Sequence, residues 1–274
     1  MQQDSIITFI GSGNMASALI GGIVKQGFPA NNIIVAGPEQ GQLDTLQQQL
    51  GVRVTTDNSA AVSEADLVVF AIKPQIFRPV LEDVRAAVAQ RKPLLISIAA
   101  GITVAAMLDW LQQPAAIVRC MPNTPALVQH GATGMFANDE VSDAQKQQAQ
   151  SVMDAVGISL WLDTESEIDA VTAVSGSGPA YYFLVMEAME AAAIEMGLTP
   201  DTARRLTQKT ALGAAALASE GSQDPAQLRV NVTSPGGTTE RALQTFEKGG
   251  LKKLFAQAME DARLRSVELA KLDG

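Results

Sequence analysis

The chain has 274 residues, enough for one large domain or two of ordinary size. Its 29 acidic and 20 basic residues leave a net charge of −9, which disfavours nucleic acid or an anionic membrane as a partner. A single cysteine, Cys120, excludes an internal disulfide framework and any multi-cysteine metal site. The N-terminus has neither a cationic region nor a long apolar run, so we expect no signal peptide, no membrane span and a cytoplasmic protein.

The first motif along the chain is a strand, a tight turn and a helix. The apolar run Ile6–Ile10 meets the spacing G-x-G-x-x-A at Gly11–Ala16, and a helical pattern then continues to Gly27. In such a motif the first glycine permits the turn, the second lets a pyrophosphate approach the backbone, and the last small residue lets helix and strand pack closely. The phosphates would lie on the free N–H groups of the helix start. The motif favours dinucleotide binding, and a tight turn without a ligand is the alternative.

A second apolar run, Ile33–Ala36, ends at Gly37, Pro38 and Glu39. In this fold the end of the second strand meets the adenosine ribose, where an NAD site usually carries an acid and an NADP site a base or small polar groups. Glu39 is acidic and no Arg or Lys lies nearby. This segment therefore favours NAD without deciding the cofactor.

Two continuous apolar runs, Leu67–Ile72 and Leu94–Ile98, are typical of parallel strands covered on both faces. Ligands bind at the carboxyl edge of such sheets. Lys73, which comes at the end of the first run, is either a cofactor-side residue or a solvated loop charge. Ala99 and Ala100 either admit a nicotinamide ring or simply allow close packing. Further strands are expected at Val52–Thr55, at Ala116–Cys120 and, on the sheet edge, at Ile158–Leu162.

Three residues near position 120 could carry other chemistry. Asn123 lies in a stiff loop between two prolines, where it either orients a carboxamide or water or merely forms a turn. His130 is the only histidine, so any catalytic site that pairs a nucleophile with a histidine depends on this residue. A zinc site with several histidine ligands would also depend on it alone, and we therefore expect no metal site. Cys120, in an apolar strand, is expected to be buried rather than nucleophilic.

The strand signal disappears from Glu165 onward, where alanine-rich helical patterns begin. This change predicts a dinucleotide-binding domain over residues 1–163 and a helical domain over 164–274. Ser175–Ala180 is expected to begin a helix whose first residue is Pro179 and which ends at Gly197. That helix is too apolar to be covered by its own domain, which suggests a homodimer.

The loop Ser234–Glu240 places a glycine pair and two threonines directly before a helix. Free N–H groups and hydroxyls at a helix start could hold a small carboxylate. The alternative is a threonine-capped connection between helices.

Together these stretches resemble pyrroline-5-carboxylate reductase, and the resemblance spans nearly the whole chain. It implies an N-terminal Rossmann-like, doubly wound α/β domain and an all-α C-terminal dimerisation domain. It also implies interlocked dimers that often assemble into rings such as decamers, and NADPH as cofactor with NADH as an alternative. The segments that carry it are Gly11–Ala16, Val69–Pro74, Ile98–Gly101, Arg119–Pro125, Asp169–Ala180 and Ser234–Thr239.

The resemblance also assigns site residues. The cofactor positions are Ile10, Gly11, Ser12, Gly13, Asn14, Met15, Gly37, Pro38, Asn58, Ala71, Ile72, Lys73, Pro74, Ile98, Ala99, Ala100 and Asn231. The substrate positions are Glu165, Ser234, Gly236, Gly237, Thr238 and Thr239. Many relatives carry a serine or another polar residue where this chain has Gly37 and Pro38, a departure that bears on the preference for NADPH. The substrate loop is expected beside the partner subunit.

The implied reaction is the reduction of the cyclic imine 1-pyrroline-5-carboxylate to L-proline, the last step of proline biosynthesis. We expect the Ser234–Thr238 loop to bind the carboxylate and the Thr239 hydroxyl to contact the ring nitrogen, which makes Thr239 the catalytic candidate. A 3-hydroxyacid dehydrogenase is disfavoured because no lysine lies between Lys146 and Lys209 to act as its base. A nucleotide-sensing protein without turnover is the other alternative.

Overall fold

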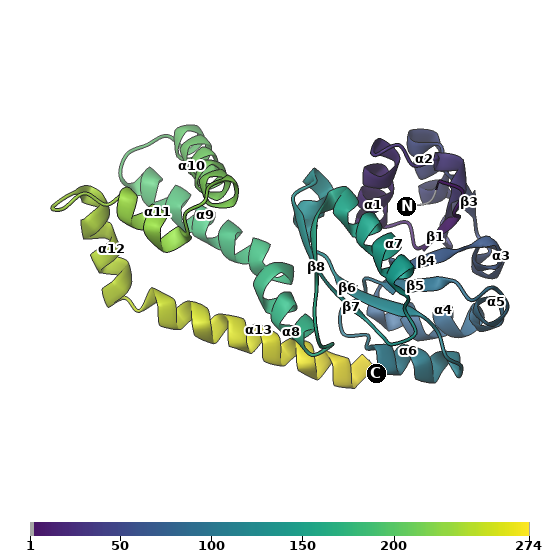
Figure 1. The fold of residues 1–274 in the computed structure, drawn as a ribbon. Helices are drawn as coiled ribbons and strands as arrows, with labels where there is room; N and C mark the ends of the chain where they lie inside the picture. Colours follow the sequence, from purple (N-terminus) through teal and green to yellow (C-terminus); the bar gives the residue numbers. More distant parts are fainter. Residues whose placement is uncertain (1–2, 274) are drawn as a thin grey trace. The chain divides into compact units, whose positions relative to one another are not determined.

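The computed structural model describes residues 3–273 (Figure 1). Contacts between Cα atoms divide the chain into two compact units. The first contains the residues up to Ser177 together with the C-terminal segment from Ala262, and the second is Gly178–Asp261. The domain division after residue 163 stays a prediction.

The first unit is built on a sheet that, within residues 3–273, has eight strands in the order β3-β2-β1-β4-β5-β6-β7-β8. From β3 through β6 every neighbouring pair is parallel. This order is that of a Rossmann fold, so the predicted doubly wound sheet is confirmed. The strands are β1 (Ile7–Ile10), β2 (Ile33–Ala36), β3 (Arg53–Thr55), β4 (Leu67–Phe70), β5 (Leu94–Ser97), β6 (Ile117–Met121), β7 (Gly131–Ala137) and β8 (Gly157–Trp161).

Helices cover both faces of this sheet. Alternate residues of each strand point to opposite faces, so each strand contributes side chains to two cores. Phe9 belongs to the core beneath α1, α2 and α7, and Ile10 belongs to the core beneath α3 to α6. Burial on both faces explains why these strands appear as unbroken apolar runs in the sequence. The helices of this unit are α1 (Asn14–Lys25), α2 (Gln40–Leu50), α3 (Asn58–Glu64), α4 (Phe77–Asp83), α5 (Arg85–Arg91), α6 (Val104–Leu111), α7 (Asp143–Met153) and α8 (Glu167–Val171).

Two features of the first unit differ from the sequence prediction. Strand β7 was not predicted, and it pairs antiparallel with β6 and parallel with β8. Its small residues weaken the strand signal; a Cβ on Gly134 would lie 2.7 Å from a Val171 methyl. The second difference is a π-helix over Thr172–Gly176, which follows α8 directly and was not predicted. The helix expected to begin within Ser175–Ala180 does begin there, at Gly178, so Pro179 is its second residue rather than its first.

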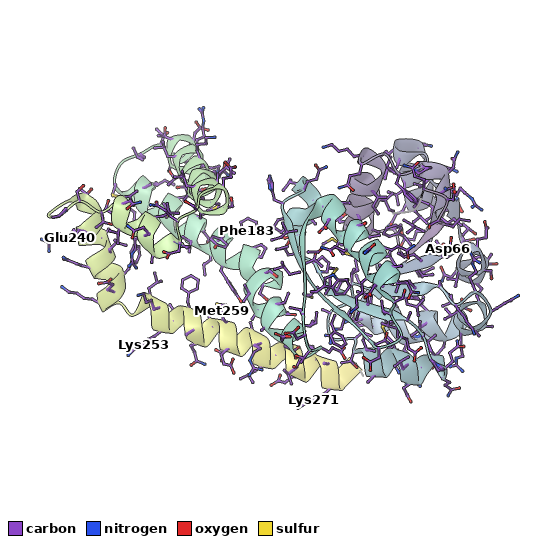
Figure 2. The ribbon with its side chains drawn as sticks, in the orientation of Figure 1. Asp66, Phe183, Glu240, Lys253, Met259 and Lys271 are labelled. Atoms are coloured by element: carbon purple, nitrogen blue, oxygen red, sulfur yellow. The ribbon has the colours of Figure 1, made fainter. Side chains whose placement is uncertain are left out.

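The second unit is entirely helical, as predicted (Figure 2). Its helix α9 has apolar residues around its whole circumference, and within the single chain Tyr182, Phe183 and Leu184 are 70%, 62% and 66% exposed. A helix that is apolar on all sides needs burial that its own unit does not supply. The helices are α9 (Gly178–Glu195), α10 (Pro200–Glu220), α11 (Pro225–Asn231), α12 (Thr238–Lys248) and α13 (Leu251–Asp273), the last of which continues into the first unit.

Within the described residues, no helix is both long and apolar enough to cross a membrane. Over the same range, no group of three or more His, Cys, Asp or Glu side chains is placed to hold a metal ion.

Candidate functional site

The turn between β1 and α1 is closed tightly at Gly11. Its φ of 107° lies in the region that favours glycine, and a Cβ there would lie 2.4 Å from the carbonyl oxygen of Ala71. The Gly11 N–H donates to the carbonyl of Ala36, at 2.7 Å, and the Ala71 N–H donates to that of Ile10, at 2.9 Å. The turn is therefore fixed against the ends of β2 and β4, and any side chain at position 11 would disrupt it.

Gly13 has a different role from Gly11. It is the N-cap of α1 with an extended backbone (φ −74°, ψ 179°), and a Cβ placed on it would meet no atom within 4 Å. No side chain of the described residues caps the first turn of α1. The helix start consequently offers N–H groups and a partial positive charge to open space, which suits a pyrophosphate. Asn14 and Met15 are the first two residues of this helix.

The other predicted cofactor residues of the first unit lie where neighbouring strands end. Ala71 and Ile72 follow β4, while Ile98, Ala99 and Ala100 follow β5. The Ile98 N–H donates to the Phe70 carbonyl, at 3.2 Å, which ties these two loops together. The Lys73 side chain is exposed before the short 3-10 turn Pro74–Ile76. Ile10 is 1% exposed and its side chain is in the core, so only its backbone can face a ligand.

The end of β2 lies directly beside the glycine turn. A Cβ on Gly37 would approach the Ser12 hydroxyl at 3.6 Å, and Ser12 Oγ donates to Gln42 Oε1 at 3.0 Å. Glu39 is the N-cap residue of α2 and is exposed, as is Pro38. Asn58 begins α3, and its Oδ1 is buried without a partner in the part of the chain that the structure describes. A buried acceptor without a donor suits a site that a ligand completes.

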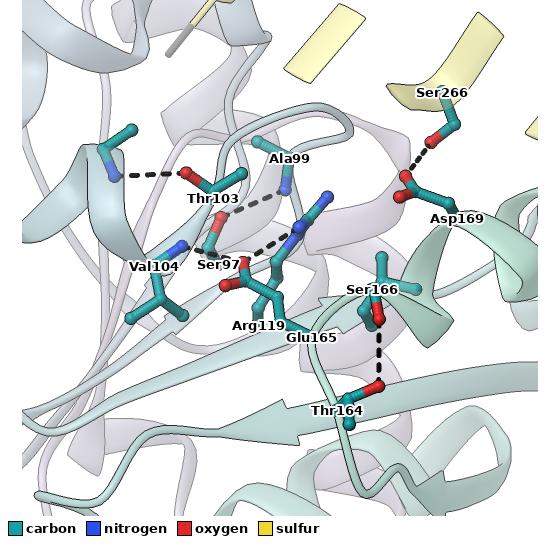
Figure 3. Close-up of polar contacts among 12 residues, drawn as sticks. Ser97, Ala99, Thr103, Val104, Arg119, Thr164, Glu165, Ser166, Asp169 and Ser266 are labelled. Carbon is teal, nitrogen blue, oxygen red and sulfur yellow. Dashed lines mark hydrogen bonds and ion pairs between the residues drawn. The ribbon is translucent and has the colours of Figure 1, made fainter. Parts of the chain in front are cut away.

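The Glu165 carboxylate forms an ion pair and a hydrogen bond within the first unit (Figure 3). Its Oε1 lies 2.9 Å from Nη1 of Arg119 on β6, and it accepts the N–H of Val104, the first residue of α6, at 2.8 Å. Arg119 is 3% exposed, and its Nε has no partner among the described residues. The carboxylate thus caps a helix and neutralises a buried guanidinium. No role for Arg119 was predicted from the sequence, although a charge inside the apolar run Ala116–Cys120 is a signal for one.

The structure shows the surroundings of Asn123, Cys120 and His130. Both polar atoms of Asn123 bond to the backbone, since Nδ2 donates to the Ser175 carbonyl and Oδ1 accepts the Ala132 N–H. The structure therefore favours a positioning role in the fold for this side chain. Cys120 is buried, as expected, and burial raises the pKa of its thiol. His130 is exposed.

In the second unit, the loop Ser234–Glu240 ends at the start of α12, where Thr238 and Thr239 are the first two helical residues. Gly236 has a φ of 72°, and its N–H donates to Oε2 of Glu240 at 2.8 Å. Gly237 is the N-cap, and no described side chain caps this helix. A glycine-rich, uncapped helix start with two hydroxyls can bind a small carboxylate.

Asn231, the remaining predicted cofactor residue, is the last residue of α11 in the second unit. Its Nδ2 donates to Gln223 Oε1 at 2.8 Å, and its Oδ1 accepts from Gln227 Nε2 at 2.9 Å. The amide is therefore oriented by two neighbouring glutamines.

These observations define the class of protein. Among the described residues, the sheet of Rossmann order carries a glycine turn at its carboxyl edge, followed by an uncapped helix start, and the Asn58 acceptor has no partner. This arrangement fits a dinucleotide and defines a dinucleotide-binding protein.

Comparisons with known proteins narrow this class. Residues 6–101 match the model of the NADP oxidoreductase, coenzyme F420-dependent family, and residues 165–269 match that of pyrroline-5-carboxylate reductase dimerisation. The chain is 50% identical over 265 residues to a pyrroline-5-carboxylate reductase of Pseudomonas aeruginosa, covering 97% of each. It is similar to the solved structure of a pyrroline-5-carboxylate reductase from Coxiella burnetii, with 45% identity and a TM-score of 0.94. The match covers 97% of this chain and 98% of that one. The structure of a pyrroline carboxylate reductase from Plasmodium falciparum, with NADP bound, is 28% identical to this chain with a TM-score of 0.86. The match covers 98% of this chain and 100% of that one.

The chain belongs to the pyrroline-5-carboxylate reductase family. It is accordingly an oxidoreductase that uses a nicotinamide cofactor, and its helical part is a dimerisation domain.

Proposed function

We propose that this chain reduces 1-pyrroline-5-carboxylate to L-proline by hydride transfer from NADPH, with NADH as an alternative, in the last step of proline biosynthesis. The observation that carries the proposal is the 50% identity to the pyrroline-5-carboxylate reductase of Pseudomonas aeruginosa, over 97% of both chains. The two glycine-rich helix starts support it, because the reaction brings together two anionic ligands, a dinucleotide and a carboxylate.

The first unit supplies the cofactor site in this proposal. The uncapped start of α1 would hold the pyrophosphate, and Gly13 leaves it room. The loops after β4 and β5 would flank the nicotinamide half, with Lys73 exposed beside them and Ala99 presenting only a methyl group. When bound, the reduced nicotinamide supplies the hydride. The residues proposed for cofactor binding are those assigned above, from Ile10 to Met15, Gly37, Pro38, Asn58, Ala71 to Pro74, Ile98 to Ala100, and Asn231.

The second unit supplies the substrate loop. The carboxylate would bind on the Ser234–Thr238 loop and accept the N–H of Thr238, where the dipole of α12 favours negative charge. The Gly236 and Gly237 N–H groups donate to Glu240 and to the Ser234 carbonyl and hold this loop in shape. The Thr239 hydroxyl would hydrogen-bond the ring nitrogen. The imine binds as its iminium form, so the proton on nitrogen is already present and the hydride completes the reduction at C5. Positioning is then the main task of the protein. We retain Glu165 as a substrate-side residue that orders the site through Arg119 and α6.

The exposed apolar circumference of α9 supports a homodimer, and larger rings such as a decamer are proposed from the family resemblance. We also propose a cytoplasmic location for this biosynthetic enzyme.

The test is to mix the purified protein with 1-pyrroline-5-carboxylate and either NADPH or NADH, and to follow the absorbance of the reduced cofactor. Consumption of cofactor with stoichiometric formation of proline supports the proposal. Tight nucleotide binding without consumption would instead identify a nucleotide-sensing protein. Sedimentation of the same preparation distinguishes a dimer from a larger ring.

A further inference from the structure

Arg119 is a buried charge in an otherwise apolar strand. Its neighbours in β6, Ile117, Val118 and Cys120, are buried, and Arg119 itself is 3% exposed. It pairs with Glu165, while its Nε is buried without an acceptor among the described residues. A buried ion pair is often no more stabilising than apolar residues of the same size, and an unsatisfied buried donor adds a further cost. Stability alone therefore does not explain why the strand carries this pair.

The Glu165 carboxylate connects Arg119 to the start of α6 (Figure 3). A single oxygen, Oε1, lies 2.9 Å from Nη1 of Arg119 and accepts the N–H of Val104, the first residue of α6, at 2.8 Å. These two donors together set the orientation of the carboxylate. The Glu165 side chain is still 25% exposed, so the pair orients an acid that remains accessible.

The loop that ends at α6 is one of the two that we propose to flank the nicotinamide. It contains Ile98 to Ala100 and begins after Ser97, whose Oγ accepts the N–H of Ala99 at 3.3 Å. Arg119 lies opposite Ser97 in the paired strands β5 and β6. The beginning of this loop therefore lies beside Arg119 in the sheet, and its end is bonded to the carboxylate that Arg119 holds.

We infer that Arg119 is a positioning residue for the reduction of the imine. It holds the Glu165 carboxylate in one orientation, and through that carboxylate it fixes the end of the nicotinamide loop relative to the substrate-side acid. Hydride transfer depends steeply on the separation and alignment of the two reacting rings, so this residue acts on the rate more than on binding. The inference rests on the proposed function, which gives Glu165 and the loop their roles.

The test compares Arg119→Met and Arg119→Lys, each alone and each combined with Glu165→Gln. Methionine removes the charge, lysine keeps it, and glutamine at position 165 keeps an acceptor for the Val104 N–H. Arg53→Met is the matched control, because it breaks an exposed ion pair of 2.8 Å with Glu64. For each protein we measure the denaturant midpoint, the dissociation constant of NADPH without substrate, and kcat and KM for 1-pyrroline-5-carboxylate at saturating NADPH.

Arg119→Met should lower kcat about 10- to 100-fold, the range for a misplaced reacting group, and leave the dissociation constant of NADPH within about twofold. Arg119→Lys should retain more of kcat, because an ammonium group still pairs with the carboxylate. In the Glu165→Gln background neither substitution should lower kcat further, since Arg119 acts through Glu165. Arg119→Met combined with Glu165→Gln should unfold near the wild-type midpoint, because no unpaired charge is left buried. Arg53→Met should leave all these quantities unchanged.

Hydrogen exchange supplies a measurement that needs no turnover. Peptides covering residues 98–106 should exchange faster in Arg119→Met than in the wild type or in Arg53→Met, because the Val104 N–H loses its oriented acceptor. If Arg119→Met does not fold, Arg119→Lys provides the same comparisons.

Unchanged exchange, or a kcat within about twofold of the wild-type value, overturns the inference. Losses of kcat that multiply in the combined variants overturn it as well, because Arg119 then acts by another route. Recovery of kcat together with the midpoint in the combined variant would make the pair purely structural. A wild-type protein that consumes no cofactor with the imine contradicts the proposed function instead, and the exchange measurement then still decides whether Arg119 holds the loop.

Discussion

Arg119 and Glu165 form an ion pair that ties β6 to the segment before α8, with Nη1 and Oε1 separated by 2.9 Å. The same carboxylate oxygen accepts the first N–H of α6. Glu165 therefore has a structural role whether or not it contacts substrate.

Replacing Glu165 by Ala should lower the free energy of unfolding by about 3 kcal/mol, because a buried guanidinium loses its counter-charge and α6 loses a cap. Glu165→Gln keeps an acceptor for Val104 and should lose about 1–2 kcal/mol. Denaturant unfolding at a fixed protein concentration measures both, with Glu140→Gln as the control. Equal stability of the Ala variant and the wild type would show that the pair contributes nothing.

The two glycines of the turn should respond differently to the same substitution. Gly11→Ala places a Cβ against the Ala71 carbonyl at a strained φ, so we expect lower stability together with lost cofactor binding. Gly13→Ala meets no protein atom, so it should cost only about 1 kcal/mol as a poorer N-cap while weakening NADPH binding about tenfold or more. Thermal unfolding and cofactor titration separate the two effects. A Gly13→Ala variant with normal affinity would place the pyrophosphate elsewhere.

Those parts of the fold that depend on local signals can be predicted from this sequence. The existence of β1 to β6 and the tight turn at Gly11 follow from apolar runs and glycine spacing, which are local signals. Strand β7 was not predicted, because its two glycines and its alanines Ala132 and Ala137 have little strand propensity. Small residues are required there by contacts with α8 and β8, which lie far away in sequence. The side-chain bonds of Glu165 and the bond from Asn123 to Ser175 span 46 to 61 residues in sequence, so no local pattern could assign them.

Thr239→Ala should lower kcat/KM for 1-pyrroline-5-carboxylate by about 5- to 150-fold, which corresponds to the roughly 1–3 kcal/mol lost when a buried partner is left unsatisfied. Thr239→Ser retains the hydroxyl and serves as the control. Steady-state kinetics with each variant at saturating cofactor measure the effect. Unchanged efficiency in the Ala variant would remove Thr239 from the catalytic role proposed for it.

Glu240 accepts the Gly236 N–H and places a negative charge beside the proposed carboxylate site. Glu240→Gln keeps an acceptor for that bond and removes the charge, so the KM for substrate should fall about two- to fivefold, the range for exposed charges, with kcat unchanged. Glu240→Ala also loses the bond and should raise the KM, because the loop is less ordered. Inhibition by proline should follow the same order in both variants. If Glu240→Gln changed neither the KM nor proline inhibition, the carboxylate would not bind at this loop.

Burial of Cys120 predicts a specific dependence of stability on pH. The folded protein raises the pKa of this thiol, so it stays neutral when folded, whereas the unfolded chain releases its proton above about pH 8.5. Ionisation then favours the unfolded state, and the contribution of Cys120 to stability is present below that pH and lost above it by about 1.4 kcal/mol per pH unit. Denaturant unfolding between pH 7 and 10 should therefore show a steeper decline for the wild type than for Cys120→Ala, which cannot ionise. Alkylation by iodoacetamide at pH 8.5 should require unfolding. Rapid labelling of the native protein, together with parallel declines of the two proteins, would mean that the thiol is accessible to water in the folded state.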